Sequence, residues 1–325
     1  MNRSWIGVLL APPACLLLFV SCSIKQMAVN KIGDSLAASG TTFASDDDVE
    51  LIGTAVPFSL KLMESLLDAS PRHRGLLFAA SSGFTQYAYA YVQQEADRLE
   101  AEDLTRANAA RDRARRLYLR ARGYGLRGLE TRHKRFGEAL RADPRAAVRV
   151  ARNDDVALLY WTAASWGAAI SISKDDPDLV ADQLLVEALV DRALELDEAF
   201  DAGTIHGFLI SYEPSRQGAT GDPAERARMH FDRAVALTDG QMASPFVSLA
   251  EAVSVPAENR QEFESLLQRA LAIDPDTRPE WRLANLIMQR RARWLLSRTD
   301  ELFLDAPSDI RGHGLTIPLG RHFGR

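Results

Sequence analysis

The stretch "FVSLAEAVSVPAENRQEFESLLQRALAIDP" (246–275) decides the fold, because it holds two helical patterns separated by a short polar turn. In its first half, apolar residues recur three and four positions apart, as they do on one face of an α-helix. Those residues are Phe246, Leu249, Ala250 and Val253. In its second half, Phe263, Leu267 and Ala270 follow at spacings of four and three, and Pro275 stands five residues later. Two helices joined in this way indicate a helical hairpin.

The pattern of the second helix recurs along the chain. In each further set, three apolar residues follow one another at the same spacings of four and three, and the first and last are small or β-branched. The matching sets are Ala114, Tyr118 and Ala121; Val186, Val190 and Ala193; and Ala227, Phe231 and Ala234. Ala234 follows Ala193 by 41 residues and precedes Ala270 by 36, near the ~34-residue tetratricopeptide period. We therefore expect a degenerate tetratricopeptide-like array, in which each hairpin hides its apolar face by stacking on its neighbours.

The remaining sequence predicts helices as well, so the fold class is all-α. Nearly every segment has a period of 3.6 residues, and no alternating strand pattern occurs. A long arginine-rich helix is expected from about residue 103 to 122, ending near Gly123, Gly125 and Gly128. Another helix is expected after Asn153. The helical domain spans 46–305, and the Gly- and Pro-containing segment 306–325 is expected to be a mobile tail.

The N-terminus predicts export and lipidation. "MNRSWIGVLLAPPACLLLFVSC" (1–22) has a basic start, an apolar run and a small residue directly before Cys22, which is the layout of a secretory signal in its lipoprotein form. We expect cleavage after Ser21 and acylation of Cys22, which would anchor the protein to a lipid bilayer, with 22–45 as the lead-in. An ordinary cleaved signal is the alternative. The expected location is the periplasm, with the outer membrane preferred because Ser23 is not an aspartate.

Composition and motifs argue against several classes of function. The formal net charge of −5 and pI near 5.8 argue against nucleic acid as a partner. "GYGLRG" (123–128) matches a dinucleotide fingerprint in letters only, since a helix rather than a strand precedes it. The six histidines form no pair at metal-ligand spacing, and no serine lies in a nucleophile elbow. We therefore expect no metal, no cofactor and no enzymatic activity.

Two tryptophans lie among small residues in "NDDVALLYWTAASWGAAISISKDDP" (153–177). Trp161 and Trp166 are five residues apart, so about 140° separates them on a helix and they cannot share one narrow face. Each either fills the core or lines a pocket with an aromatic wall. The sequence leaves these alternatives open for both tryptophans and for the adjacent Tyr160.

A second candidate set lies near the C-terminus. Trp281 and Asn285 share one helical stripe, with Arg282 beside it. A buried Asn285 needs partners, which could be a neighbouring helix end or a ligand. Arg282 could bind a ligand carboxylate through two hydrogen bonds. Alternatively, Asp154 or Asp155 pairs with it, and we favour such a structural pair.

Several long stretches resemble the T component of tripartite ATP-independent periplasmic (TRAP) transporters, the TatT family. They are "PFSLKLMESLLDASP" (57–71), "RARRLYLRARGYGLRGLE" (113–130), "DDVALLYWTAASWGAAISISKDDP" (154–177), "FVSLAEAVSVP" (246–256) and "PEWRLANLIMQRRARWLLSRTDELFL" (279–304). The resemblance implies a periplasmic lipoprotein of cryptic tetratricopeptide hairpins. It also implies a homo-oligomer, with a trimer as one arrangement, and association with the transporter's solute-binding (P) protein. A largely apolar central tunnel is implied too.

The leading hypothesis is therefore a non-enzymatic, lipid-anchored subunit that docks the solute-binding protein of a TRAP transporter. It would pass an apolar or weakly acidic ligand through the tunnel. The alternative is a general envelope scaffold lipoprotein that binds no small molecule. A tunnel wide enough for a ligand favours the first, and a solid core favours the second.

Overall fold

A computed structural model describes residues 30–31, 33–35 and 40–303. The expected signal peptide 1–21, the lipidation site Cys22 and the tail 306–325 lie outside the described residues. Within the described ranges no strand occurs, so the all-α prediction is confirmed. In that part of the chain, no helix combines the length and apolar composition needed to cross a bilayer.

Helices follow one another with short connections along the described chain. Many begin where an Asp or Asn side chain accepts a hydrogen bond from a backbone N–H of the first turn, as Asp48, Asp103, Asp222 and Asn259 do. The elements are α2 (Gly40–Ala44), α3 (Val49–Ala69), α4 (Arg74–Tyr87), η1 (Ala88–Gln93), α5 (Gln94–Leu99), α6 (Leu104–Glu130), α7 (Phe136–Ala142), α8 (Pro144–Ala147), η2 (Val148–Val150), η3 (Asn153–Asp155), α9 (Val156–Ser171), α10 (Pro177–Ala181), α11 (Gln183–Leu196), α12 (Phe200–Tyr212), η4 (Glu213–Ser215), α13 (Pro223–Leu237), α14 (Ser244–Leu249), η5 (Ala250–Ser254), α15 (Arg260–Ala272), η6 (Pro279–Trp281), α16 (Arg282–Ser297) and α17 (Thr299–Leu302).

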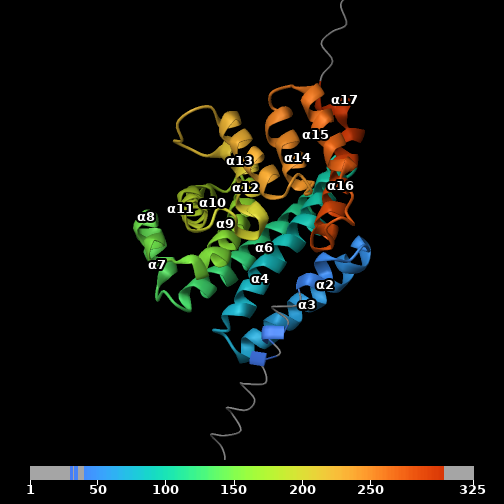
Figure 1. Cartoon of the computed structure of the whole chain (residues 1–325). Helices are drawn as coiled ribbons and strands as arrows, with labels where there is room; N and C mark the ends of the chain where they lie inside the picture. Colours follow the sequence, from blue (N-terminus) through green and yellow to red (C-terminus); the bar gives the residue numbers. More distant parts are fainter. Residues whose placement is uncertain (1–29, 32, 36–39, 304–325) are drawn as a thin grey trace, which may run out of the picture.

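The helices pack in chain order and then return to the start (Figure 1). Helices α3, α4, α6, α9 and α11 each contact the next, and α12 to α16 do the same. Helix α16 also contacts α2 and α3. There Arg290 forms an ion pair with Glu50 at 2.7 Å, and Arg282 donates to the Ser45 carbonyl at 2.9 Å. The last long helix therefore lies against the first hairpin, and the array encloses space between them.

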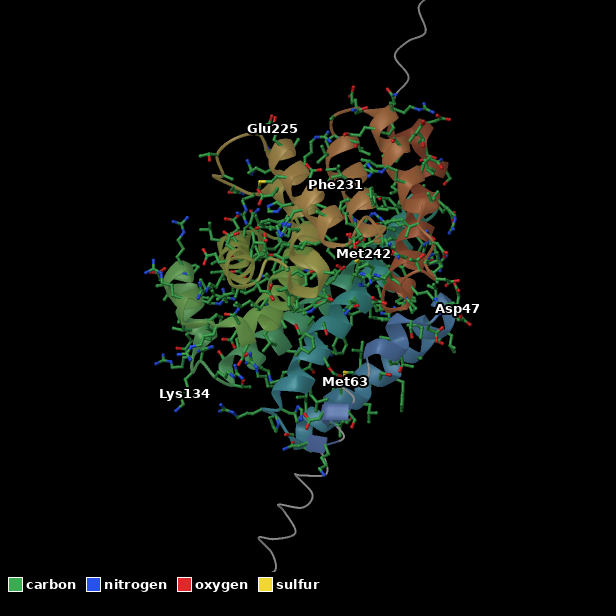
Figure 2. The ribbon with its side chains drawn as sticks, in the orientation of Figure 1. Asp47, Met63, Lys134, Glu225, Phe231 and Met242 are labelled. Atoms are coloured by element: carbon green, nitrogen blue, oxygen red, sulfur yellow. The ribbon has the colours of Figure 1, made fainter. Side chains whose placement is uncertain are left out.

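The residues that match the hairpin pattern form the core. Every position of the pattern except Pro275 is buried, on α6, α11, α13 and the segment from α14 to α15. Figure 2 places Phe231, one of these positions, on α13, where its ring meets that of Phe246 edge to face at 5.4 Å. The apolar face predicted for each helix is thus the face that packs on its neighbours. The tetratricopeptide identity of the hairpins stays a prediction.

The expected end of the arginine-rich helix near Gly123 is wrong, because α6 continues through all three glycines to Glu130. A Cβ atom on Gly125 would lie 2.1 Å from Thr162 Oγ1, and one on Gly128 would lie 2.5 Å from Leu158 Cδ2. These two glycines therefore permit close contact between α6 and α9 rather than ending the helix.

Candidate functional site

Two adjoining cavities, both partly open to solvent, lie where α16 meets the first hairpin. The first, of about 610 Å³, is bounded by α2, α3, α4, η1, α9, α12 and α16. The second, of about 430 Å³, extends from there towards α14 and η6. Figure 2 labels one lining residue of each, Met63 on α3 and Met242 before α14. Seven residues line both cavities: Ala44, Gln86, Ala90, Trp161, Asp201, Leu283 and Ile287.

Aromatic side chains dominate the wall of the second cavity near this junction. The Tyr160 ring meets that of Trp161 edge to face at 4.9 Å and that of Phe208 at 6.4 Å. The Tyr160 hydroxyl lies 3.2 Å from Thr204 Oγ1, and burial raises the pKa of Tyr160 to about 12. The hydroxyl is therefore neutral at physiological pH and acts as a hydrogen-bonding group, not a base.

Asp201 brings a carboxylate to the junction through an unusual backbone. Asp201, Ala202 and Gly203 have consecutive φ values of 46°, 53° and 83° at the start of α12. Left-handed backbone is strained for alanine, and such strain is concentrated at functional sites. A Cβ atom on Gly203 would also lie 2.7 Å from Leu237 Cδ1, so only glycine fits there. The turn holds Asp201 against both cavities.

Three of the predicted ligand-contact residues line the cavities. Trp161 lines both, and Tyr160 and Trp281 line the second. Trp281 is half-buried, and the guanidinium of Arg278 lies 4.7 Å from its ring centroid. The second cavity is thus lined by residues from both the 154–177 and the 279–304 stretches. Their contact with a ligand stays a prediction.

Trp166 lies outside the residues that line the two cavities. Its side chain is 1 % exposed, and it packs under the guanidinium groups of Arg122 at 4.6 Å and Arg141 at 5.7 Å. Trp161 and Trp166 therefore point to different surroundings, as their spacing predicts. Of the two alternatives, core packing is the one that the structure gives Trp166.

Asn285 also lies outside the cavity lining. Its Oδ1 accepts from the Ala243 N–H at 2.9 Å, and its Nδ2 donates to the Gln241 carbonyl at 3.0 Å. The side chain is 1 % exposed. The amide therefore joins α16 to the connection between α13 and α14, which is the helix-end alternative.

The expected pairing of Arg282 with Asp154 or Asp155 is wrong. Arg282 Nε lies 2.8 Å from Asp276 Oδ1, in the loop before η6. Asp155 is buried and binds Arg74 at 2.6 Å, whereas Asp154 pairs with Arg132 at 3.0 Å. Both aspartates lie at the start of α9, beside Arg74 at the start of α4 and Arg132 after α6. Arg282 lies in another part of the fold, beside the loop that contains Asp276.

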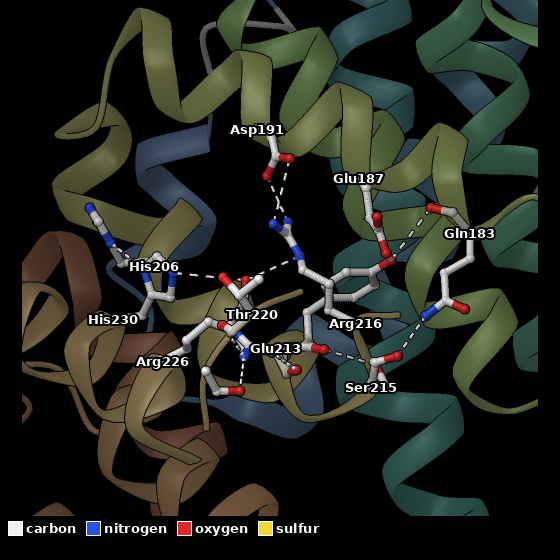
Figure 3. Close-up of polar contacts among 12 residues, drawn as sticks. Gln183, Glu187, Asp191, His206, Glu213, Ser215, Arg216, Thr220, Arg226 and His230 are labelled. Carbon is white, nitrogen blue, oxygen red and sulfur yellow. Dashed lines mark hydrogen bonds and ion pairs between the residues drawn. The ribbon is translucent and has the colours of Figure 1, made fainter. Parts of the chain in front are cut away.

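A polar cluster fills the space between α11, α12, η4 and α13 (Figure 3). Glu213, 3 % exposed, binds Arg226 Nε at 2.6 Å and Arg216 Nε at 3.2 Å. His206 and His230 face each other beside it. Within the described part of the chain, no group of three or more metal-ligating side chains has the geometry of a metal site.

Asp201 is the site residue that the sequence did not identify. It lies in "LDEAFDAG" (196–203), where acids are common and nothing marks one of them. The only local signal is the Asp-Ala-Gly run, whose first and last members tolerate positive φ. Its position against Trp161 depends on the packing of α9 on α12.

Comparison with known proteins supplies the context for this site. Residues 45–303 match the family model described as "TRAP transporter T-component". An uncharacterized protein of Treponema pallidum (strain Nichols) is 30% identical over 310 residues, which are 90% of this chain and 96% of the relative. The family match covers every element that bounds the two cavities except α2.

Proposed function

Because this chain belongs to the TRAP transporter T-component family, a family of accessory transport subunits rather than enzymes, we propose that it docks the solute-binding protein of such a transporter. In this proposal the protein lies in the periplasm, and acylated Cys22 tethers it to the envelope, with the outer membrane preferred. The signal-like segment 1–22 supports the tether. The all-α array supports docking, since stacked hairpins present extended surfaces.

The observation that carries the proposal is the pair of adjoining cavities. Together they extend from the α3–α4 hairpin to α14, and Trp161 lies where they adjoin. Each is large enough for a small organic molecule. We infer that a largely apolar ligand occupies this space and passes between the two cavities on its way to or from the solute-binding protein.

We also propose that the protein is a homo-oligomer, as the resemblance implies. Helix α3 carries three exposed apolar side chains on one face, Leu51, Phe58 and Leu62, and Phe58 is 73 % exposed. Such a stripe suits contact with a second copy of the chain. Size-exclusion chromatography with light scattering would give a multiple of the monomer mass for the mature chain, and Phe58→Glu would lower it.

The test of docking is a pull-down from the native envelope in mild detergent, with bound proteins identified by mass spectrometry. Recovery of a TRAP solute-binding protein is expected. Recovery of cell-wall or assembly factors in its place would favour the general scaffold and overturn the proposal. As a separate test of the tether, replacement of segment 1–22 by an ordinary cleavable secretory signal should move the protein from the envelope to the soluble periplasmic fraction.

A further inference from the structure

The charged residues that line the two cavities are all acidic. Asp201 lines both cavities and Glu280 lines the second, and among the described residues no Lys, Arg or His belongs to either lining. Glu280 is partly neutralised, since Arg278 Nε lies 3.7 Å from its Oε1. An anionic ligand would therefore enter without a cationic partner and beside a carboxylate, which is unfavourable in a desolvated site.

Asp201 itself has no partner within the described residues. No ion pair reaches its carboxylate, and it accepts no hydrogen bond from any side chain or backbone N–H of that part of the chain. The residue retains accessible surface, yet burial raises the pKa of its carboxyl. The residue is exposed by surface area, and its side chain borders two cavities that are partly open to solvent, where neighbouring protein atoms desolvate the carboxylate in part. A carboxylate in this position is stabilised by a cation that enters the cavity.

The same part of the cavity has walls suited to a cation. Trp161 lines both cavities, and the neighbouring Tyr160 ring lines the second, whereas the Trp281 ring is already occupied by the guanidinium of Arg278. Aromatic faces attract ammonium groups through their negative quadrupole, most strongly in desolvated sites, and cages of this kind bind quaternary ammonium ligands. The apolar remainder of the lining, including Leu283 and Ile287, suits a hydrocarbon body.

Building on the proposed function, we propose that the ligand is an apolar molecule with one positively charged amine or quaternary ammonium group, held at the junction by Asp201 and the rings of Tyr160 and Trp161. The carboxylate gives charge selectivity, the rings add attraction for the cation, and the two cavities hold the apolar body. This inference argues against the weakly acidic ligand expected from the sequence.

The inference is tested by isothermal titration of the purified mature chain with three probes that differ only in charge. These are 4-phenylbutylamine, 4-phenylbutan-1-ol and 4-phenylbutanoate at pH 7. The amine should bind at least about tenfold more tightly than the alcohol, as expected for one desolvated charge pair. The carboxylate should bind most weakly.

Asp201→Asn provides the matched variant, because asparagine also tolerates left-handed backbone and keeps the size of the side chain. It should remove the preference for the amine and change the affinity for the alcohol less than twofold. Glu280→Gln is the control and should keep the preference.

Three outcomes of these titrations would contradict the proposed charge of the ligand. Tighter binding of the carboxylate, equal binding of amine and alcohol, or an amine preference that survives in Asp201→Asn would overturn the charge assignment and leave the cavity as an apolar ligand site. Failure of all three probes to bind would overturn it together with the ligand-holding part of the proposed function. The envelope pull-down would still test docking independently.

Discussion

His206 and His230 lie with their Nδ1 atoms 2.9 Å apart, buried between α12 and α13. One Nδ1 must donate and the other accept, so at least one of the two rings is neutral. Protonation of both rings would place two donors and two positive charges in contact. Burial lowers the pKa of both residues against the opposing effect of Glu198 and Glu213, and the pKa of His230 falls to about 4.

This pair predicts a loss of stability in mild acid. The charged groups around it are Glu198, Glu213, Arg216, Arg226 and Arg233. Because the folded-state pKa of His230 lies below its unfolded value near 6.5, the unfolded chain binds more protons between the two values, and stability falls as pH decreases from about 6.5 to about 4. The effect is on the order of 3 kcal/mol.

His230→Gln isolates this contribution, since glutamine can hydrogen-bond but does not titrate. Urea unfolding of both proteins at pH 7 and pH 4.5 should show a smaller acid loss for the variant. Buried carboxylates add their own pH dependence to both proteins, so the difference between the two is the relevant quantity. Equal acid losses would contradict the assignment.

Gly125 and Gly123 form a matched pair on α6. An added Cβ at Gly125 meets Thr162 Oγ1, whereas one at Gly123 meets nothing within 4 Å. We expect Gly125→Ala to lower the free energy of unfolding by about 1–3 kcal/mol through overpacking. Gly123→Ala should raise it by about 0.5–1 kcal/mol, because alanine favours helix. Thermal unfolding of the two variants measures both; equal effects would disprove the close α6–α9 contact.

Asn285 predicts a structural rather than a ligand-binding phenotype. Asn285→Ala leaves the Ala243 N–H and the Gln241 carbonyl without their partner, so we expect a loss of about 2 kcal/mol in the free energy of unfolding. The exposed Asn108→Ala should change it by less than about 0.5 kcal/mol. Chemical denaturation gives the comparison. A variant of Asn285 that kept full stability but lost binding of the apolar probes would instead place this amide at the ligand.

Asp155 should matter far more than its neighbour Asp154. Burial opposes ionisation of Asp155, but the Arg152 N–H, His133 and Arg74 outweigh it and hold its pKa lowered. Asp155→Asn should cost about 2 kcal/mol, since it leaves Arg74 without its buried partner. Asp154→Asn, with the side chain 74% exposed, should be nearly neutral. Urea unfolding midpoints at pH 7 compare them; similar shifts would contradict this difference.

The spacing of apolar residues predicted many of the buried helix faces, because each helix packs through residues three and four positions apart. The spacing of Phe263, Leu267 and Ala270 identified a buried face without any knowledge of the neighbouring helix. The angle between Trp161 and Trp166 likewise follows from helix geometry alone. Glycine was misread because the same residue ends some helices and allows close packing of others, and only the position of α9 decides the case of Gly125.

The rest of the site depends on contacts between segments far apart in the chain. Arg282 bonds to Ser45, 237 positions away, and no periodic pattern encodes that closure. Asp201 becomes distinctive only when its left-handed turn lies against the same space as Trp161. The partner of Arg282 and the role of Asp201 were therefore beyond prediction from the sequence.

We propose that the space around Trp161 holds a small molecule. Native mass spectrometry of the chain, purified from its own envelope, tests this most directly, with Ala90→Trp to fill the junction and Ala109→Trp as an exposed control on α6. We expect one released small molecule per chain in the unmodified protein and in Ala109→Trp, and none in Ala90→Trp. An unmodified protein with no bound molecule, or an adduct that persists in Ala90→Trp, would contradict it.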